Sequence, residues 1–415
     1  MSQSPSLSKT VLTAHLGIAL GLSPLPFYTL TVLAPILSDS LALPVASLMA
    51  GISIMTVVVI GAGPWVGKLT DRLGVKPVVL VSQTAFSLAL MAFALNHGSV
   101  WQYWLHWLLL SIAGLGTMPV VWLKALNQFS TPRKAQVFAW ALSGTGVCAL
   151  TLPKLCQWLL ATPEVTVGPI NLHNWQLVYV VLGLIALLPL IPSGLVLQGK
   201  SVGHAEHVVR PDIVNPTTGM TLSEAVKQRQ FWLIALAFLP ISFAVGGPIP
   251  NLMFIFKQHH FELTLVGRVL PSLGIWVIVG RLTGGWLMDR LPAAKAALVM
   301  LSLPLLALLW LLFIPTPTDS IWPILLLVMG LGLAIGLEYD LLAYLTARYF
   351  GRKHFGLIYA TLYSAFALGA GFAATIYAYM NTLSHSYDPI LLVGASGMLV
   401  GAMALLCLGN YRFND

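Results

Sequence analysis

Charged side chains are scarce in this sequence. Asp, Glu, Lys and Arg make up 8% of the 415 residues, whereas a soluble globular domain carries about 25%. A chain with so little charge cannot cover its surface for contact with water, so a soluble fold is excluded. Long polar segments are lacking as well, and the longest runs only from residue 198 to 230.

Residues that hold metals or perform covalent chemistry are equally sparse. The three cysteines, Cys148, Cys156 and Cys407, lie in apolar stretches without metal-ligand spacing, which indicates buried, reduced thiols. His259 and His260 have no third ligand nearby, so we interpret them as part of a solvated loop. Zinc-protease, nucleophile-elbow and phosphate-loop motifs are absent. We therefore expect neither an enzyme nor a bound cofactor or metal.

Apolar residues dominate instead. They form 58% of the chain and recur from residue 14 to 409 in runs of about 20 residues, the length of a helix that crosses a bilayer. These runs lack the alternation of barrel strands, which predicts an all-α membrane protein. The first run has no cleavage site and is kept as a span. The twelve predicted spans are 14–37, 44–66, 77–96, 101–126, 135–160, 174–197, 231–256, 264–288, 294–314, 319–347, 355–380 and 388–409.

The spans fall into two sets of six. We predict an N-terminal six-helix bundle at 1–197, a cytoplasmic linker at 198–230 and a C-terminal six-helix bundle at 231–415. Within the linker, Thr221-Leu-Ser-Glu224 matches a capping box and predicts a short interfacial helix. Pro24 and Pro26 in span 1 and Pro248 and Pro250 in span 7 predict breaks at matching places in the two halves.

Basic residues are spread singly through the loops. The formal net charge of +8 is not gathered on one face, which argues against a nucleic-acid partner. If the N-terminus is cytoplasmic, most of the 21 Lys and Arg residues fall in inner loops. The positive-inside rule therefore predicts that both termini are cytoplasmic.

Two loops at matching positions carry a repeated motif. GKLTDRLGVKP at 67–77 follows span 2, and GWLMDRLPAAK at 285–295 follows span 8. Glycine permits close helix approach, and the acidic residue can accept hydrogen bonds from a helix N-terminus or an arginine, which suits a breakable inner latch. The alternative is a solvated loop. The predicted latch residues are Gly67, Asp71, Arg72, Gly285, Asp289 and Arg290.

The paired motif, the six-plus-six layout and the length resemble the major facilitator superfamily over nearly the whole chain. VGRLTGGWLMDR at 279–290 and GLEYDLLAYLTARYFGRKHFG at 336–356 resemble its bacterial members near the monocarboxylate transporter and oxalate:formate antiporter branch. The resemblance implies two pseudo-symmetric bundles around a central cavity, in a bacterial inner membrane. It also implies a carboxylate substrate moved with protons or a counter-anion, and we expect a monomer in the lipid bilayer.

Arg281 in span 8 is the leading binding residue. It precedes Asp289 by eight residues, which places it roughly 12 Å inside the membrane. Its guanidinium can bind a carboxylate through two parallel hydrogen bonds, and the resemblance assigns carboxylate binding to this position. A structural ion pair with Glu338 or Asp340 is the alternative.

Glu338 and Asp340 in span 10 are the candidates for proton coupling, because an acid in a low-dielectric cavity can change protonation as its surroundings change. They are two residues apart and point to different sides of the helix. Glu338, nearer the midplane, is slightly favoured, but the choice between the two stays open. The alternative is that both lock neighbouring spans together. Further candidate substrate-binding residues at suitable depth are Lys124, Tyr28, Asn251, Tyr359 and Tyr363.

The sequence thus predicts a secondary transporter of a small organic anion, a monocarboxylate or related carboxylate, that works by proton symport or anion exchange. One alternative is an exporter of hydrophobic or cationic compounds, in which Glu338 or Asp340 binds the cation. Another is a membrane sensor that binds a ligand without moving it.

Overall fold

The computed structural model describes residues 6–127, 129, 134–162, 165–167, 170–197, 219–314, 319–351 and 353–413. The side chains of Asp71, Asn127, Lys134, Ala135 and residues 165–167 and 170–172 are outside that description. Most of the predicted linker, 198–218, and the carboxylate predicted for the latch at Asp71 therefore lie outside the described residues. The chain divides into two compact units, Met1–Pro211 and Asp212–Asp415.

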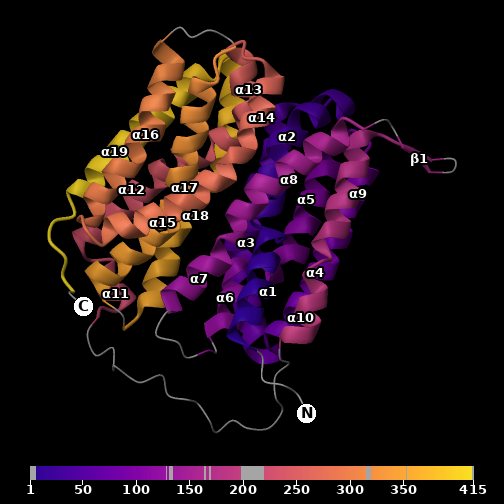
Figure 1. The fold of residues 1–415 in the computed structure, drawn as a ribbon. Helices are drawn as coiled ribbons and strands as arrows, with labels where there is room; N and C mark the ends of the chain where they lie inside the picture. Colours follow the sequence, from indigo (N-terminus) through magenta and orange to yellow (C-terminus); the bar gives the residue numbers. More distant parts are fainter. Residues whose placement is uncertain are drawn as a thin grey trace. The chain divides into compact units, whose positions relative to one another are not determined.

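The described part of the first unit is helical apart from one hairpin (Figure 1). The strands β1 (Val165–Val167) and β2 (Ile170–Leu172) pair antiparallel, with Thr166 opposite Asn171. The helices are α1 (Leu7–Ala19), α2 (Pro24–Leu41), α3 (Val45–Leu73), α4 (Val75–Ala92), η1 (Phe93–Leu95), α5 (Val100–Gly114), η2 (Leu115–Thr117), α6 (Pro119–Asn127), α7 (Lys134–Leu142), α8 (Gly144–Leu160), α9 (Asn174–Ala186) and α10 (Leu190–Val196).

The described part of the second unit is built from helices (Figure 1). They are α11 (Leu222–Ala225), α12 (Arg229–Gly246), α13 (Pro248–Gln258), α14 (Leu263–Val269), η3 (Leu270–Ser272), α15 (Leu273–Met288), α16 (Ala293–Phe313), α17 (Trp322–Phe350), α18 (Phe355–Ser384) and α19 (Asp388–Leu406). The short helix α11 has the expected capping box, in which the Glu224 amide donates to the Thr221 hydroxyl and the Thr221 amide to the Glu224 carboxylate.

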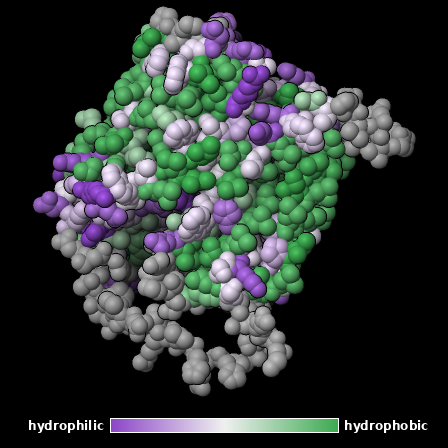
Figure 2. Space-filling model, viewed as in Figure 1, coloured by the Kyte–Doolittle hydropathy of each residue, from purple (hydrophilic) through white to green (hydrophobic). Residues whose placement is uncertain are grey.

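Within the described residues, eleven helical segments are long and apolar enough to cross a membrane. Predicted span 5 is the exception, because a turn at Ser143 divides it into α7 and α8, and neither piece reaches that length alone. Large apolar side chains such as Val81, Trp101 and Leu195 are exposed, and apolar residues cover much of the visible surface (Figure 2). Lipid is the solvent that suits such a surface, so the prediction of an all-α membrane protein is confirmed.

Spans 1 and 7 are broken where their prolines predict. α1 ends at Ala19 and α2 begins at Pro24, while α12 ends at Gly246 and α13 begins at Pro248. A break inside a membrane frees backbone groups that must find partners within the protein. In the first unit the buried Gln83 amide donates to the carbonyl of Leu20, at the break, and to that of Ala186, where span 6 is interrupted.

The same helix pairings recur in each unit. In the first unit, α3 packs on α5, α4 packs on α9, and α2 packs on α8. In the second unit, the helices at matching positions do the same: α15 packs on α17, α16 packs on α19, and α12 packs on α18. The repeat seen in the two loop motifs therefore extends to the internal packing of each unit. The pairing of α15 with α17 positions the candidate site.

Candidate functional site

Four glycines bring α15 and α17 into close contact. Gly280 and Gly284 lie four residues apart on α15, and Gly332 and Gly336 lie four apart on α17. A Cβ on Gly280 would lie 2.4 Å from the Leu333 carbonyl oxygen, and one on Gly336 would lie 2.3 Å from the Val277 carbonyl oxygen. Small residues at this spacing let helix backbones approach in lipid. The contact sets the side chains that flank these glycines against one another.

Arg281 is held at this crossing. A Cβ on Gly336 would lie 2.6 Å from the Arg281 backbone nitrogen. The backbone of Arg281 is therefore part of the close contact between the two helices. Its side chain is only 7% exposed, and its Nε lies 3.8 Å from Asp340 Oδ2. That separation is an ion pair but exceeds hydrogen-bond length. Arg281 Nε and Nη1 have no hydrogen-bond partner among the described residues, which leaves buried donors that a carboxylate can satisfy.

The structure separates the two acids of span 10. Asp340 faces Arg281 and its side chain is 36% exposed. Glu338 is 5% exposed, and its Oε1 has no hydrogen-bond partner within the part of the chain that the structure describes. The described ion pairs of Arg281 include Asp340 and not Glu338. The sequence left this choice open and slightly favoured Glu338, whereas in the structure Asp340 forms the ion pair with Arg281.

Tyr359 and Tyr363 belong to a column of rings on α18. Phe355, Tyr359, Tyr363 and Phe366 stack in sequence, with centroid separations of 5.6, 6.0 and 5.5 Å and interplanar angles of 13°, 23° and 26°. Tyr339, next to Asp340 on α17, lies 6.1 Å from the Tyr363 ring and 5.0 Å from the Phe366 ring. The electrostatic surroundings of Tyr359 include both Arg281 and Asp340. The column therefore passes beside the ion pair.

The other predicted binding residues make contacts of their own. Lys124 and Tyr28 belong to the first unit: the Lys124 ammonium donates to the Gly67 carbonyl at 3.4 Å, and Tyr28 is 5% exposed, with its ring against that of Phe27. Asn251 is fully buried. Its amide donates to the carbonyls of Gly247 and Ala374, so it stabilises the break in span 7, and we leave it out of the proposed binding set.

The latch motifs show an arrangement that the sequence did not indicate. A Cβ on Gly67 or Gly285 would meet no atom within 4 Å, so neither glycine makes the close helix approach expected of it. Arg290 instead lies over the Trp286 ring, with 4.0 Å from Cζ to the centroid. Asp289 ends α15 as its C-cap residue, and Arg72 lies in the last turn of α3.

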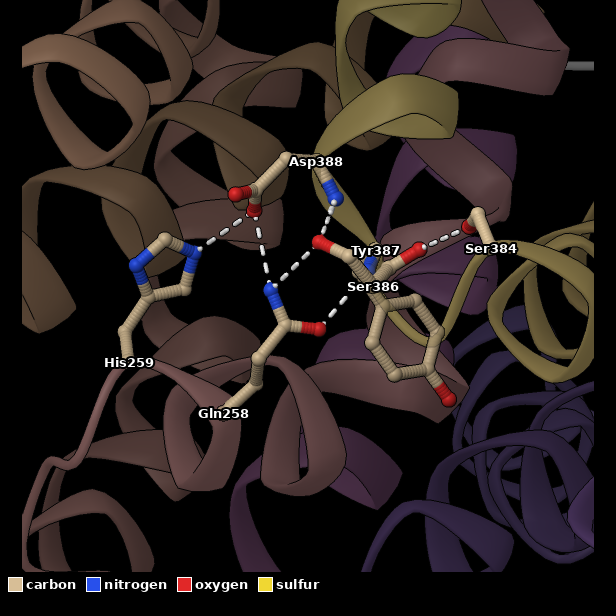
Figure 3. A network of polar contacts seen from close by, with 6 residues as sticks. All are labelled: Gln258, His259, Ser384, Ser386, Tyr387 and Asp388. Atoms are coloured by element: carbon tan, nitrogen blue, oxygen red, sulfur yellow. Dashed lines mark hydrogen bonds and ion pairs between the residues drawn. The ribbon is translucent and has the colours of Figure 1, made fainter.

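His259 does not lie in a solvated loop, and that interpretation was wrong. Its side chain is 17% exposed and Nε2 lies 3.1 Å from Asp388 Oδ1. The Gln258 amide donates to the same oxygen and to the Ser386 hydroxyl, both at 3.0 Å, and its carbonyl accepts from the Tyr387 amide at 2.7 Å. Figure 3 shows how these bonds tie the end of α13 to the segment before α19. Gln258 and His259 lie about 130 residues from Asp388 in the sequence, so no local sequence pattern predicts these hydrogen bonds.

Comparison with known proteins identifies relatives over most of the chain. The sequence profile of the Major Facilitator Superfamily matches residues 16–374. The chain is 22% identical over 351 residues to monocarboxylate transporter 13 of Bos taurus, covering 83% of this chain and 76% of that protein. It is also 22% identical over 348 residues to the uncharacterized MFS-type transporter YhjX of Escherichia coli strain K12, covering 83% and 81%.

Solved structures share the fold at low identity. The nucleoside transporter NupG, crystallised as a point mutant, superposes with a TM-score of 0.72 at 12% identity, covering 97% of this chain and 99% of that one. A bacterial homologue of the human lysosomal transporter Spinster, inward-facing and unoccupied, gives 0.66 at 14% identity, covering 97% and 94%. At such identities the likeness extends to the fold and not to the ligand.

Proposed function

This chain belongs to the Major Facilitator Superfamily of membrane transporters, and we propose that it carries a small organic anion, a monocarboxylate or related carboxylate, by alternating access. The observation that carries the proposal is Arg281, a buried guanidinium whose Nε and Nη1 have no hydrogen-bond partner among the described residues. Leaving such donors unsatisfied is costly, and a carboxylate is the group that matches their planar geometry. The similarity to monocarboxylate transporter 13 supports the same substrate class.

Asp340 is the internal competitor of the substrate in this proposal. Without substrate, its carboxylate balances Arg281 at 3.8 Å. When a substrate carboxylate binds the guanidinium, two anions face one cation in a site of low dielectric constant, and binding a proton removes the excess charge. Asp340 would then take up one proton for each anion bound and release it when the anion leaves. This exchange makes the loaded and empty sites equal in net charge, which couples anion movement to protons.

Glu338 has a different part in the proposal. It shares no described ion pair with Arg281, and its buried Oε1 has no described partner. An isolated carboxylate at such a place is most stable in its neutral form. We therefore assign proton coupling to Asp340 and give Glu338 a structural role. The unsatisfied oxygen also favours a second candidate function, export of lipophilic cations that would pair with Glu338.

We further propose that the protein resides in a bacterial inner membrane with both termini in the cytoplasm, which the inward bias of Lys and Arg supports. We propose a monomer, since Arg281 and Asp340 come from a single unit of one chain.

A reconstituted transport assay tests the site. Proteoliposomes would be given lactate, pyruvate, acetate or benzoate under an inward proton gradient, and uptake would be compared between the wild type and Arg281→Lys. Lysine keeps the charge and loses the two-pronged geometry. We expect the apparent affinity for the transported acid to fall roughly 10- to 150-fold, the equivalent of one hydrogen bond to a charged group. Arg268→Lys, at an exposed position of the same unit, is the matched control and should be unchanged.

Two further variants assign the proton. Asp340→Asn should still bind the carboxylate but lose the dependence of binding on pH, because its amide cannot take up a proton. Glu338→Gln should keep that dependence. Full uptake by Arg281→Lys would refute the site, and an unaltered pH profile in Asp340→Asn would refute the coupling. If none of the four acids is taken up and lipophilic cations bind to the protein instead, the export function is favoured.

A further inference from the structure

The ring column on α18 gives the proposed carboxylate site a side wall of a particular chemistry. Tyr359, Tyr363 and Phe355 are each partly exposed, while Phe366 at the end of the column is 4% exposed. A stack that served only as bundle core would be sealed along its whole length. Here three successive rings keep accessible surface, and the buried fourth ring supports them. Tyr359 belongs to this accessible section, and its electrostatic surroundings include Arg281 and Asp340.

The hydroxyl of Tyr359 adds a donor to this wall. A tyrosine hydroxyl can donate and accept a hydrogen bond, and Tyr359 is the ring of the column whose electrostatic surroundings include Arg281 and Asp340. A phenol ordinarily finds a partner when its ring lies inside a protein. The unpartnered buried donors at this place are Arg281 Nε and Arg281 Nη1, and the Tyr359 hydroxyl is a further group that can donate to a carboxylate oxygen.

Beyond these donors, the next surface along α18 is aromatic. Tyr359 and Tyr363 stack with a centroid separation of 6.0 Å, and Tyr339 approaches Tyr363 from α17 at 6.1 Å. A ligand whose carboxylate binds Arg281 would place its body against these rings. Aromatic rings favour offset-stacked or edge-to-face contacts with other aromatic rings over contacts with saturated groups of equal size.

Resting on the proposed function, we infer that the preferred substrate is an aromatic carboxylate, with its carboxylate on Arg281 and the Tyr359 hydroxyl and its ring against Tyr359 and Tyr363. Lactate- or acetate-sized acids satisfy the guanidinium but leave the ring column without a partner. The same column makes Tyr359 and Tyr363 the residues that determine specificity, while Arg281 determines affinity for the carboxylate itself.

The test compares two acids that differ in one property. Benzoate and cyclohexanecarboxylate have the same number of carbon atoms and the same charge, but only benzoate is planar with π faces. Their Kd values would be measured by calorimetry on the purified full-length protein in detergent micelles. We expect the wild type to bind benzoate roughly 2- to 12-fold more tightly, the factor that one aromatic pair provides beyond its buried area.

Three variants locate the preference. Tyr359→Leu and Tyr363→Leu should bring the ratio of the two Kd values close to one. Tyr359→Phe keeps the ring and should preserve the ratio while weakening both acids, because it removes the hydroxyl donor. Tyr377→Phe is the control, since Tyr377 lies on the same helix, is fully buried and is outside the column; its ratio should equal that of the wild type.

The outcomes separate this inference from the proposed function. If the wild type binds both acids equally, or if Tyr359→Leu and Tyr363→Leu keep the wild-type ratio, the aromatic specificity is refuted while the carboxylate site stands. If neither acid binds the wild type, both are refuted. Should the leucine variants fail to fold, the wild-type ratio and Tyr359→Phe still decide the question, because both rings are then intact.

Discussion

Adding one methyl group at Gly336 should force α15 and α17 apart. In Gly336→Ala the new Cβ would lie 2.3 Å from the Val277 carbonyl oxygen and 2.6 Å from the Arg281 nitrogen. Both are backbone atoms that no change of side-chain rotamer can move. Ordinary contact of a Cβ begins at 3.4 Å, so the helices must separate by about 1 Å at this point, which is overpacking of a close contact.

The expected cost follows from the geometry. Overpacking of this kind costs about 1–3 kcal/mol, partly offset by up to about 1 kcal/mol because alanine favours the helix over glycine. Gly285→Ala isolates the clash, because Gly285 is also helical but its new Cβ would meet no atom within 4 Å. Both variants receive the helix gain, so their difference in unfolding free energy should be the full 1–3 kcal/mol, with Gly336→Ala the less stable.

The separation should also be felt at the ion pair. An increase from 3.8 Å to roughly 5 Å between Arg281 and Asp340 weakens their attraction by about 1 kcal/mol at an effective dielectric constant near 20. Overpacking is the larger effect, so stability is the quantity to measure. Thermal unfolding of the full-length protein in detergent, followed by size-exclusion chromatography, gives the apparent melting temperature. Equal melting temperatures for Gly336→Ala and Gly285→Ala would refute the packing argument.

Two other predictions concern the loops. Gln258→Ala removes the hydrogen bonds that tie α13 to the segment before α19; we expect a loss of about 1–3 kcal/mol of local stability, seen as faster hydrogen exchange at residues 384–390, and unchanged exchange would contradict it. At the start of α11, hydrogen bonds from the Thr221 amide and hydroxyl hold the pKa of Glu224 below its ordinary 4.5. The capping box should thus stabilise α11 above pH 4.5 and be lost as pH falls through the lowered pKa. Carbon NMR of the Glu224 carboxyl should show this midpoint, and Thr221→Ala should raise it; a midpoint that stays in place would refute the assignment.

Much of the fold could be predicted because its causes are local or compositional. Runs of apolar residues that lack the alternation of barrel strands must form helices in lipid, where helices and closed barrels are the structures that satisfy the backbone's polar groups. The breaks before Pro24 and Pro248 follow from the missing amide hydrogen of proline. The Thr221 capping box is a four-residue signal and formed where expected. The division of span 5 at Ser143 carried no such signal and was missed.

The glycines that the motif points to differ from those that make the close contact between helices. The sequence analysis noted Gly67 and Gly285 because they open the repeated loop motif, yet a Cβ at either would meet open space. Gly280 and Gly336 make the close approach instead. The four-residue spacing of glycines on spans 8 and 10 was the available signal. Recognising it required knowing that these two spans pack on each other.

By itself, the sequence determined that this protein is an all-α membrane protein with broken first and seventh spans and an arginine within span 8. Those properties depend on composition, hydropathy and proline, which act within one helix. Tertiary structure alone decided that Asp340 and not Glu338 meets Arg281, and that His259 is bonded to Asp388. Two positions of one helix are equivalent candidates until a neighbouring helix packs against one side of it, so the choice belongs to the packing.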